Sequence, residues 1–252
     1  MTEKDTKAES PLPLAAGVTL LCEDSGIVAL SKPEGVRAHP NAGGTVDPGA
    51  LLAAPFDPDG EFYTLPGGGR LHLLHRIDAP TSGVLILTAN EALAKAVRAL
   101  FASHAVRKRY LALVVGEGPR APQLWRDRLK TVRGKNGART IVGQGDPSEA
   151  AAKTLSTGRA KNGMRLSLLS LEPATGRTHQ LRVQCASRRI PIVGDATYGD
   201  FAANRRAAKE LGIKRLCLHA ERLSFELDWK GGSIDFHVKS PEPEFFKSVF
   251  AS

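Results

Sequence analysis

The chain has 252 residues, 42% of them hydrophobic and 24% charged, which is the composition of an ordinary globular protein and excludes a disordered one. Lys and Arg number 35 against 26 Asp and Glu, and the net charge of +9 is typical of nucleic-acid-binding proteins, although other basic proteins share it. No apolar run approaches the ~18–20 residues that span a bilayer, and the three dispersed cysteines fit no disulfide framework or thiolate metal site, so we expect a cytoplasmic protein.

The predicted elements begin after a flexible tail at residues 1–15, which is polar, then Pro-rich, and has no apolar signal segment. Two apolar stretches at 18–22 and 27–30, separated by the turn-forming sequence EDSG, predict a β-hairpin. Residues 40–70 contain much Gly and Pro and predict irregular structure with one short helix near Leu51.

Strands are predicted farther along at 84–88 and 111–115, on either side of a helix over about 90–104 that Asn90 is expected to cap. The elements together predict an α+β fold with a large, mostly antiparallel mixed sheet. The last predicted elements are a helix from Thr178 to about Arg188 and strands at 166–171, 223–227 and 234–238.

Residues 126–139 carry six basic side chains against one acid, Asp127. The Asn136-Gly137 pair within this segment is a strong tight-turn signal. We interpret the segment as a protruding basic hairpin, with a merely solvated charged face as the alternative.

The chemistry-bearing segment is HRIDAPTSG at residues 75–83, where a His, an Arg and an Asp precede a turn into an apolar strand. In extended backbone Arg76 and Asp78 point to the same side, which places a cation beside a carboxylate. Loop residues held by a rigid strand often form sites, and a local ion pair that stabilises the turn is the alternative. The nearby pair His72 and His75 lacks further ligands for a metal ion.

Two more segments follow in order, GRTHQLR at 176–182 and GDATYG at 194–199. Together with HRIDAPTSG they resemble the signatures HRxDxxTSG, GRTHQ(I/L)R and GDxxYG of the RluA-like pseudouridine synthases. The likeness runs from about residue 18 to the C-terminus. Shorter segments agree with it, namely KPEG at 32–35, KRYLA at 108–112 and LHA at 218–220.

The resemblance implies a pseudouridine synthase fold for residues 16–252, with an active-site cleft across the sheet. It implies an enzyme that isomerises uridines in ribosomal or transfer RNA to pseudouridine, with no metal or organic cofactor, and we expect a monomer. No S4-like RNA-binding domain is expected before residue 18, so RNA capture would rest on this domain and its loops. The side chains of the basic hairpin expected to contact RNA are Arg128, Lys130, Arg133 and Lys135.

The resemblance also implies the catalytic residues. Asp78 matches the catalytic aspartate of the family, and Arg182 matches the basic residue that pairs with it. Tyr110 matches the active-site tyrosine that packs against the target base. The residue after Asp78 is Ala79, where many relatives have a basic residue, and this departure leaves the catalytic group unchanged.

Three further positions match the substrate side of the site. Arg76 matches an arginine that enters the RNA stack where the uridine has flipped out, Leu181 matches an apolar wall, and His75 matches a loop-shaping position. Tyr198, within GDATYG, is expected to shape a turn rather than to catalyse.

Breaking a glycosidic C–N bond leaves the sugar electron-poor, and a carboxylate can attack it, take a proton or stabilise positive charge. The sequence leaves open which of these Asp78 does, and which RNA and which uridine are modified. Two other functions are weighed: an inactive RNA-binding or RNA-chaperone module of the same fold, and a hydrolase of small glycosides. The intact trio of Asp78, Tyr110 and Arg182 disfavours the first, and the lack of a second acid in a comparable motif disfavours the second.

Overall fold

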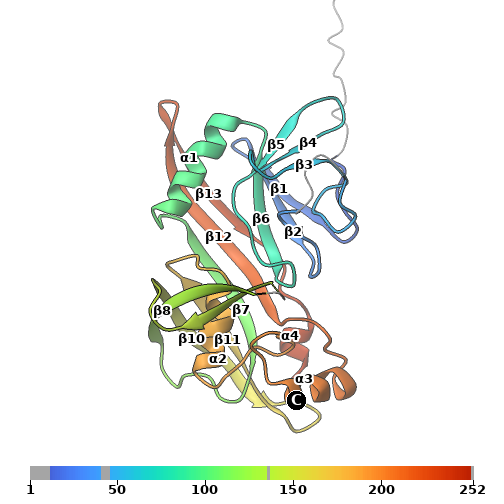
Figure 1. Cartoon of the computed structure of the whole chain (residues 1–252), viewed down its shortest axis with the longest axis vertical. Helices are drawn as coiled ribbons and strands as arrows, with labels where there is room; N and C mark the ends of the chain where they lie inside the picture. The colour runs from blue at the N-terminus through green and yellow to red at the C-terminus, as the bar shows by residue number, and fades with distance from the viewer. Residues whose placement is uncertain (1–11, 41–45, 135–136, 251–252) are drawn as a thin grey trace, which may run out of the picture.

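One curled sheet runs through the molecule and joins an upper and a lower half (Figure 1). The computed structural model describes residues 12–40, 46–134 and 137–250. Within these residues the sheet has 13 strands, and every strand pair is antiparallel except β6 with β12. The predicted α+β fold with a large, mostly antiparallel mixed sheet is therefore confirmed.

The first hairpin forms where it was predicted, from β1 (Thr19–Asp24) and β2 (Ile27–Lys32). Its turn residues Ser25 and Gly26 have φ angles of 52° and 77°. Two consecutive positive φ angles match the twist of the flanking strands, which explains why a Ser-Gly pair occupies this turn.

The predicted helix near Leu51 is wrong. Leu51 and Leu52 are buried, and the N–H of Leu51 donates to the carbonyl of Arg37 at 3.1 Å instead of to a helical partner. Pro48-Gly49 and Pro55 leave too few residues between them to nucleate a helix. Short strands follow in the same region, namely β3 (Phe56–Asp57), β4 (Phe62–Thr64) and β5 (Arg70–Leu73).

The predicted N-terminal tail ends earlier than residue 15. The N–H of Ala53 donates to Pro13 O at 2.8 Å and the N–H of Ala15 donates to Leu51 O at 3.1 Å, which fastens residues 12–15 to the neighbouring loop. Residues 1–11 lie outside the described residues, so a flexible tail there stays a prediction.

The strand and helix after HRIDAPTSG are both confirmed. β6 (Ser82–Thr88) is buried at every position and pairs with β2, β5 and β12. The side chain of Asn90 accepts the N–H of Leu93 at 3.0 Å and so caps α1 (Glu91–Ala102), as predicted. The buried face of α1 packs in one core with β6 and β12, which fixes the last turn of α1 beside the loop before β6.

The lower half is built on long hairpins. The basic segment forms the predicted hairpin, although its turn residues 135–136 lie outside the described residues. No element was predicted between this hairpin and residue 166, yet a 14-residue strand fills the place beside it. The strands are β7 (Arg107–Val115), β8 (Gln123–Gly134), β9 (Gly137–Val142), β10 (Asp146–Arg159) and β11 (Arg165–Pro173).

The predicted cap at Thr178 is wrong. The helix begins two residues later, and the carbonyl of Thr178 accepts the hydroxyl of Thr140 at 2.9 Å. His179 precedes the helix in a left-handed conformation, with φ of 54°.

None of the helices in the described residues is long and apolar enough to cross a membrane. The remaining elements are α2 (Gln180–Ser187), α3 (Phe201–Glu210), β12 (Leu218–Trp229), β13 (Gly232–Lys239) and α4 (Phe245–Ser248).

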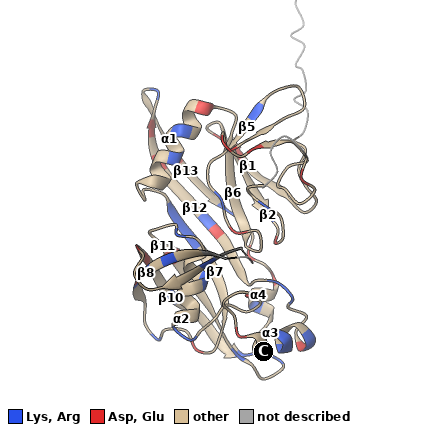
Figure 2. Ribbon diagram, viewed as in Figure 1, with Lys and Arg blue, Asp and Glu red and all other residues tan. Residues whose placement is uncertain are grey.

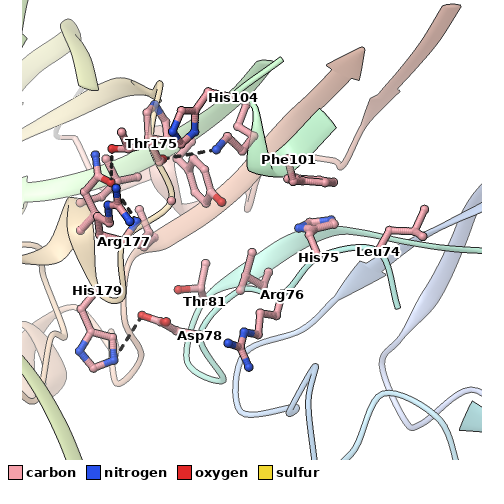
Figure 3. Close-up of a pocket in the computed structure, with 18 of the residues that line it drawn as sticks. Leu74, His75, Arg76, Asp78, Thr81, Phe101, His104, Thr175, Arg177 and His179 are labelled. Carbon is pink, nitrogen blue, oxygen red and sulfur yellow. Dashed lines mark hydrogen bonds and ion pairs between the residues drawn. The ribbon is translucent and has the colours of Figure 1, made fainter. Parts of the chain in front are cut away.

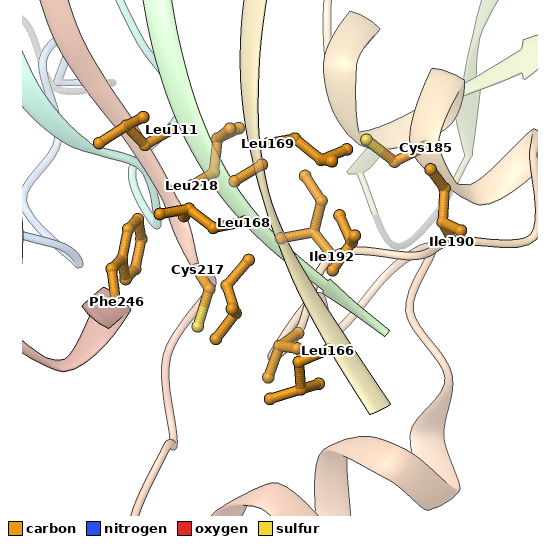
Figure 4. Close-up of a cluster of buried hydrophobic side chains, with 14 of the residues drawn as sticks. Leu111, Leu166, Leu168, Leu169, Cys185, Ile190, Ile192, Cys217, Leu218 and Phe246 are labelled. Atoms are coloured by element: carbon orange, nitrogen blue, oxygen red, sulfur yellow. The ribbon is translucent and has the colours of Figure 1, made fainter. Parts of the chain in front are cut away.

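Strand β12 belongs to both halves and holds them in register. Its first residues join the lower core of Leu111, Leu169 and Cys185 (Figure 4), and its later residues join the upper core with α1. It pairs in parallel with β6 and antiparallel with β7 at neighbouring positions. The loop before β6 and the strand β7 are thereby brought to the same place between the halves.

Candidate active site

A cleft of about 510 Å³ lies where the two halves meet (Figure 3). Its walls come from the loop between β5 and β6, the end of α1, strand β7, and the segment that leads into α2. A volume of several hundred Å³ is that of an ordinary small-molecule pocket and can take one nucleoside. The cleft residues that the sequence singled out are His75, Arg76, Asp78, Tyr110, Leu181 and Arg182.

Lys32 fixes the loop that carries Asp78 by hydrogen bonds to backbone carbonyls. This lysine is buried, and its ammonium group donates to the carbonyls of Pro33, Val36 and Ala79 at 2.8–2.9 Å. Burial and then the charge of Arg215 lower the pKa of Lys32 to about 7. In its charged form the lysine donates all three ammonium protons to these carbonyls. The KPEG turn is therefore bonded directly to Ala79, the residue that follows Asp78.

Gly83 fixes the other end of the loop. Its φ is +115°, and a Cβ at this position would lie 2.1 Å from the carbonyl oxygen of Ala220. Only glycine allows β6 and β12 to approach this closely. Beside it, the hydroxyl of Ser82 accepts a bond from Arg215 at 2.6 Å and meets Nδ1 of His219 at 2.9 Å. The TSG and LHA segments are therefore partners across one strand pair.

Asp78 is held by Arg182, as predicted. Nη1 of Arg182 donates to Oδ2 of Asp78 at 3.0 Å, while the Asp78 side chain keeps 27% of its surface exposed to the cleft. The opposite edge of the guanidinium group is bound by the buried Asp195, through Nε–Oδ2 at 2.8 Å and Nη2–Oδ1 at 2.9 Å. Arg182 is thus clamped by one carboxylate and presented to another.

The surroundings of Arg182 and Asp195 keep both of these side chains charged. Burial acts to lower the pKa of Arg182, but the hydrogen bonds and charge of Asp195, followed by Asp78, raise the pKa above its ordinary value. Burial acts to raise the pKa of Asp195, and the Arg182 guanidinium outweighs it, so the pKa lies below its usual range. The N–H groups of Thr197 and Tyr198 also donate to Asp195. The GDATYG segment is therefore the anchor of Arg182.

Tyr110 stands on β7 and lines the cleft. Burial and then the charge of Asp78 raise the pKa of its phenol, so the ring is neutral at physiological pH. Its hydroxyl makes no hydrogen bond within the described residues, so both the ring and the hydroxyl are available to a ligand.

Arg76 and His75, which precede Asp78 in the same loop, have different surroundings. Arg76 is exposed at the cleft and has no carboxylate partner within 4 Å among the described residues, so the local ion pair considered for this turn does not form. His75 lies flat against Phe101, with ring centroids 4.9 Å apart (Figure 3). Burial and then Lys108 lower the pKa of His75 to about 3, which makes it a neutral wall of the cleft. Leu181 is buried at the start of α2 and supplies apolar surface.

The basic hairpin lies beside the cleft, and β9 contacts α2. Arg128 and Lys130 are exposed on β8, and the ribbon beside the β8 label carries basic residues in Figure 2. The side chain of Arg133 and the whole of Lys135 lie outside the described residues. A second hollow of about 540 Å³ runs between the hairpin and the cleft, and Thr175 and His104 line both.

Sequence reasoning missed three residues that organise the site, Lys32, His179 and Asp195, and it expected of Tyr198 only that it shapes a turn. All four lie within segments that had been noticed, KPEG, GRTHQLR and GDATYG, but a motif does not reveal which of its side chains face inward. No group of three or more His, Cys, Asp or Glu side chains in the described ranges could hold a metal ion. His72 lies buried on β5 and His75 lines the cleft.

Comparisons with known proteins agree with this arrangement. The family model described as RNA pseudouridylate synthase matches residues 26–187. The chain is 32% identical to "tRNA pseudouridine synthase C" of Yersinia pestis, over 89% of this chain and 87% of the relative. It is 33% identical to "Ribosomal large subunit pseudouridine synthase C" of Vibrio vulnificus, over 82% of this chain and 60% of the relative. The solved structure of human RNA Pseudouridylate Synthase Domain Containing 1 shares the fold, with a TM-score of 0.68 and 24% identity over 92% of this chain and 86% of that one.

Proposed function

The chain belongs to the RNA pseudouridylate synthase family, and from this premise we propose that Asp78 is its catalytic carboxylate and that transfer RNA is its first substrate class. It is an RNA pseudouridine synthase, an isomerase of uridine in RNA. The family membership also favours an active enzyme over an inactive binding module. Residues 16–252 would form the catalytic domain.

The reaction breaks the bond between C1′ of the ribose and N1 of uracil and forms a bond between C1′ and C5. The hydrogen on C5 leaves as a proton, and N1 takes up a proton, so the product is an isomer. A carboxylate beside C1′ can attack the sugar, stabilise its positive charge or remove the C5 proton. Asp78 has the placement for each of these roles, because it is partly exposed inside a cleft of nucleoside size.

The single observation that carries the proposal is the clamp of Asp195, Arg182 and Asp78. A cation whose far side is bound by a buried carboxylate cannot rotate away, so it holds Asp78 in a fixed orientation. Tyr110 would pack against the uracil ring from β7, and Leu181 would complete the apolar wall. Preorganised groups of this kind cost no rearrangement during the reaction.

Arg76 would assist base flipping. The target base cannot react while stacked, and flipping it costs a few kcal/mol. An exposed guanidinium group without a carboxylate partner among the described residues can fill the vacated space and contact phosphates. His75 would shape the entrance by its stack on Phe101.

The basic hairpin would hold the RNA outside the cleft. Arg128 lines the second hollow, where a phosphate backbone would pass, and Lys130 is exposed two residues farther along the same strand. Arg133 and Lys135 remain expected contacts from the sequence alone. Capture by these loops would not require a separate RNA-binding domain.

Transfer RNA is favoured over ribosomal RNA as the first substrate class because of how the relatives align. The relatives named for transfer RNA are matched over 81–87% of their own length, whereas the relative named for the large ribosomal subunit is matched over 60%. We also infer a cytoplasmic monomer that binds no metal. The three free cysteines, two of them buried, fit a reducing compartment.

The test uses RNA from cells that lack this gene, labelled at C5 of uridine with tritium. Pseudouridine formation releases the label to water, so counts released by the purified protein measure turnover. The transfer RNA and ribosomal RNA fractions are assayed separately and their pseudouridines are mapped. Release from the transfer RNA fraction that disappears in Asp78→Asn supports the proposal. Release from neither fraction, or equal release by the variant, would contradict it.

A further inference from the structure

The hydroxyl of Tyr198 joins the basic hairpin to the catalytic carboxylate. It accepts the backbone N–H of Thr140 on β9 at 2.7 Å and lies 2.9 Å from Nδ1 of His179. The other ring nitrogen, Nε2 of His179, faces Oδ2 of Asp78 at 3.8 Å (Figure 3). A continuous line of polar contacts therefore runs from the hairpin to Asp78.

The protons along this line can be assigned by counting donors and acceptors. A phenol has one proton to donate, and the Tyr198 oxygen already accepts from Thr140. A phenol oxygen can accept a second bond, but Tyr198 has no other acceptor for its own proton among the described residues. We therefore assign that proton to Nδ1 of His179, which is then the unprotonated nitrogen of the ring. In a neutral imidazole the proton then sits on Nε2, the nitrogen that faces Asp78.

The surroundings of His179 keep the ring neutral. Burial lowers its pKa below the ordinary value, the charge of Asp78 opposes this, and Arg182 adds to the lowering. Asp195 also acts to raise the pKa, and the guanidinium of Arg139 lies 5.7 Å from the centre of the Tyr198 ring. Above its lowered pKa the ring is a neutral donor aimed at a carboxylate.

We propose that His179 is a positioning residue whose Nε2–H holds Oδ2 of Asp78, with Tyr198 fixing the ring in the required tautomer. The inference rests on the proposed catalytic role of Asp78. Arg182 already binds the same oxygen at 3.0 Å, so both contacts point to Oδ2 and leave Oδ1 for the sugar. At 3.8 Å the His179 contact is too long for a hydrogen bond, and catalytic contacts of this kind commonly tighten when substrate closes the site.

A purely structural role for His179 makes the opposite prediction from the donor role. The residue has φ of 54° at the start of α2 and makes no side-chain cap. Asparagine tolerates this left-handed backbone better than glutamine does. The amide nitrogen of Asn reaches about as far as Nδ1, and that of Gln about as far as Nε2. A structural role therefore favours His179→Asn, and the donor role favours His179→Gln.

The two variants are compared by tritium release from transfer RNA, with kcat and KM measured separately and melting curves recorded. His179→Gln is expected to keep kcat within about threefold of wild type. His179→Asn is expected to lose roughly 10- to 100-fold in kcat, the effect of one hydrogen bond to a charged group, with KM little changed. The reverse order, or equal activities, overturns the inference.

The tautomer itself can be observed without turnover. In protein labelled with ¹⁵N-histidine, the His179 signals, identified by their loss in His179→Asn, are expected to show a protonated Nε2 and a bare Nδ1. Tyr198→Phe is expected to abolish this preference. A protonated Nδ1 in the wild type contradicts the inference. Asp78→Asn is assayed in parallel: if it is inactive while both His179 variants match wild type, the positioning role fails and the proposed function stands, whereas an active Asp78→Asn removes the proposed function itself.

Discussion

Replacing Arg182 with methionine separates the structural and catalytic parts of the site. The guanidinium lies between Asp195, which is 1% exposed, and Asp78, which is 27% exposed in its side chain. Arg182→Met leaves Asp195 as an uncompensated buried charge, and breaking a buried ion pair in this way costs about 3–5 kcal/mol of folding free energy. The variant also removes the charge-assisted hydrogen bond to Asp78, worth about 1.5–3 kcal/mol, or roughly 10- to 150-fold in rate.

Adding Asp195→Asn to Arg182→Met tests this partition. The double variant no longer buries an unpaired charge, so it is expected to recover much of the lost unfolding free energy in urea titrations. Its turnover, measured by tritium release, is expected to stay as low as that of Arg182→Met, because Asp78 still lacks its partner. Recovery of turnover in the double variant, or an Arg182→Met protein as stable as wild type, would refute the reasoning.

The pH dependence of stability adds an independent check. In the wild type the pKa of Asp195 is lowered, so its contribution to stability is present above the ordinary carboxyl range near pH 4 and is lost as pH falls through the lowered pKa. In Arg182→Met the buried carboxyl has lost its cation, so burial raises its pKa above the unfolded value. The free energy of unfolding of Arg182→Met should therefore move closer to that of the wild type as the pH falls from about 7.5 to about 5.

Three further predictions concern the substrate. Tyr110→Phe keeps the ring, so RNA affinity should survive while kcat drops; equal kcat would show that the hydroxyl has no part in the reaction. Neutralising Arg128, Lys130, Arg133 and Lys135 together should weaken binding of every RNA. It should also lower the slope of log K against log salt by roughly 0.7–0.9 for each phosphate that the hairpin no longer neutralises. An unchanged slope would mean that the hairpin is only a solvated charged face. Arg76→Ala should lose more activity on a structured stem-loop than on a short unstructured RNA, where little stacking must be broken. The rates on the two RNAs should differ tenfold for each ~1.4 kcal/mol of stacking. The same loss on both RNAs would assign Arg76 to the chemical step.

Elements with strong local signals could be predicted from the sequence. The first hairpin follows from its Ser-Gly turn, and α1 follows from Asn90 and the helical spacing behind it. The pairing of Arg182 with Asp78 was also predicted, and they meet at 3.0 Å although 104 residues separate them. That prediction came from the family signatures, because nothing in the local sequence places α2 opposite the loop before β6.

What could not be predicted depends on contacts with distant parts of the chain. The strand β10 contains Glu, Lys and several Ala, which do not favour a strand, and it forms because β8 and β11 pair with it on both sides. Leu51 looks like part of a helix until the carbonyl of Arg37 takes its N–H. Asp195 was noticed only as part of the GDATYG segment, since its carboxylate becomes important only when the fold buries Arg182 against it.

The most direct test of the catalytic assignment is Asp78→Asn. The substitution keeps the size and polarity of the side chain and removes its charge. Turnover on transfer RNA from cells lacking the gene should fall at least ~10⁴-fold, the effect of losing a nucleophilic or acid–base group, while RNA affinity measured in the same buffer changes little. Residual turnover above a few per cent of wild type, with affinity intact, would contradict the assignment of Asp78 as the catalytic carboxylate.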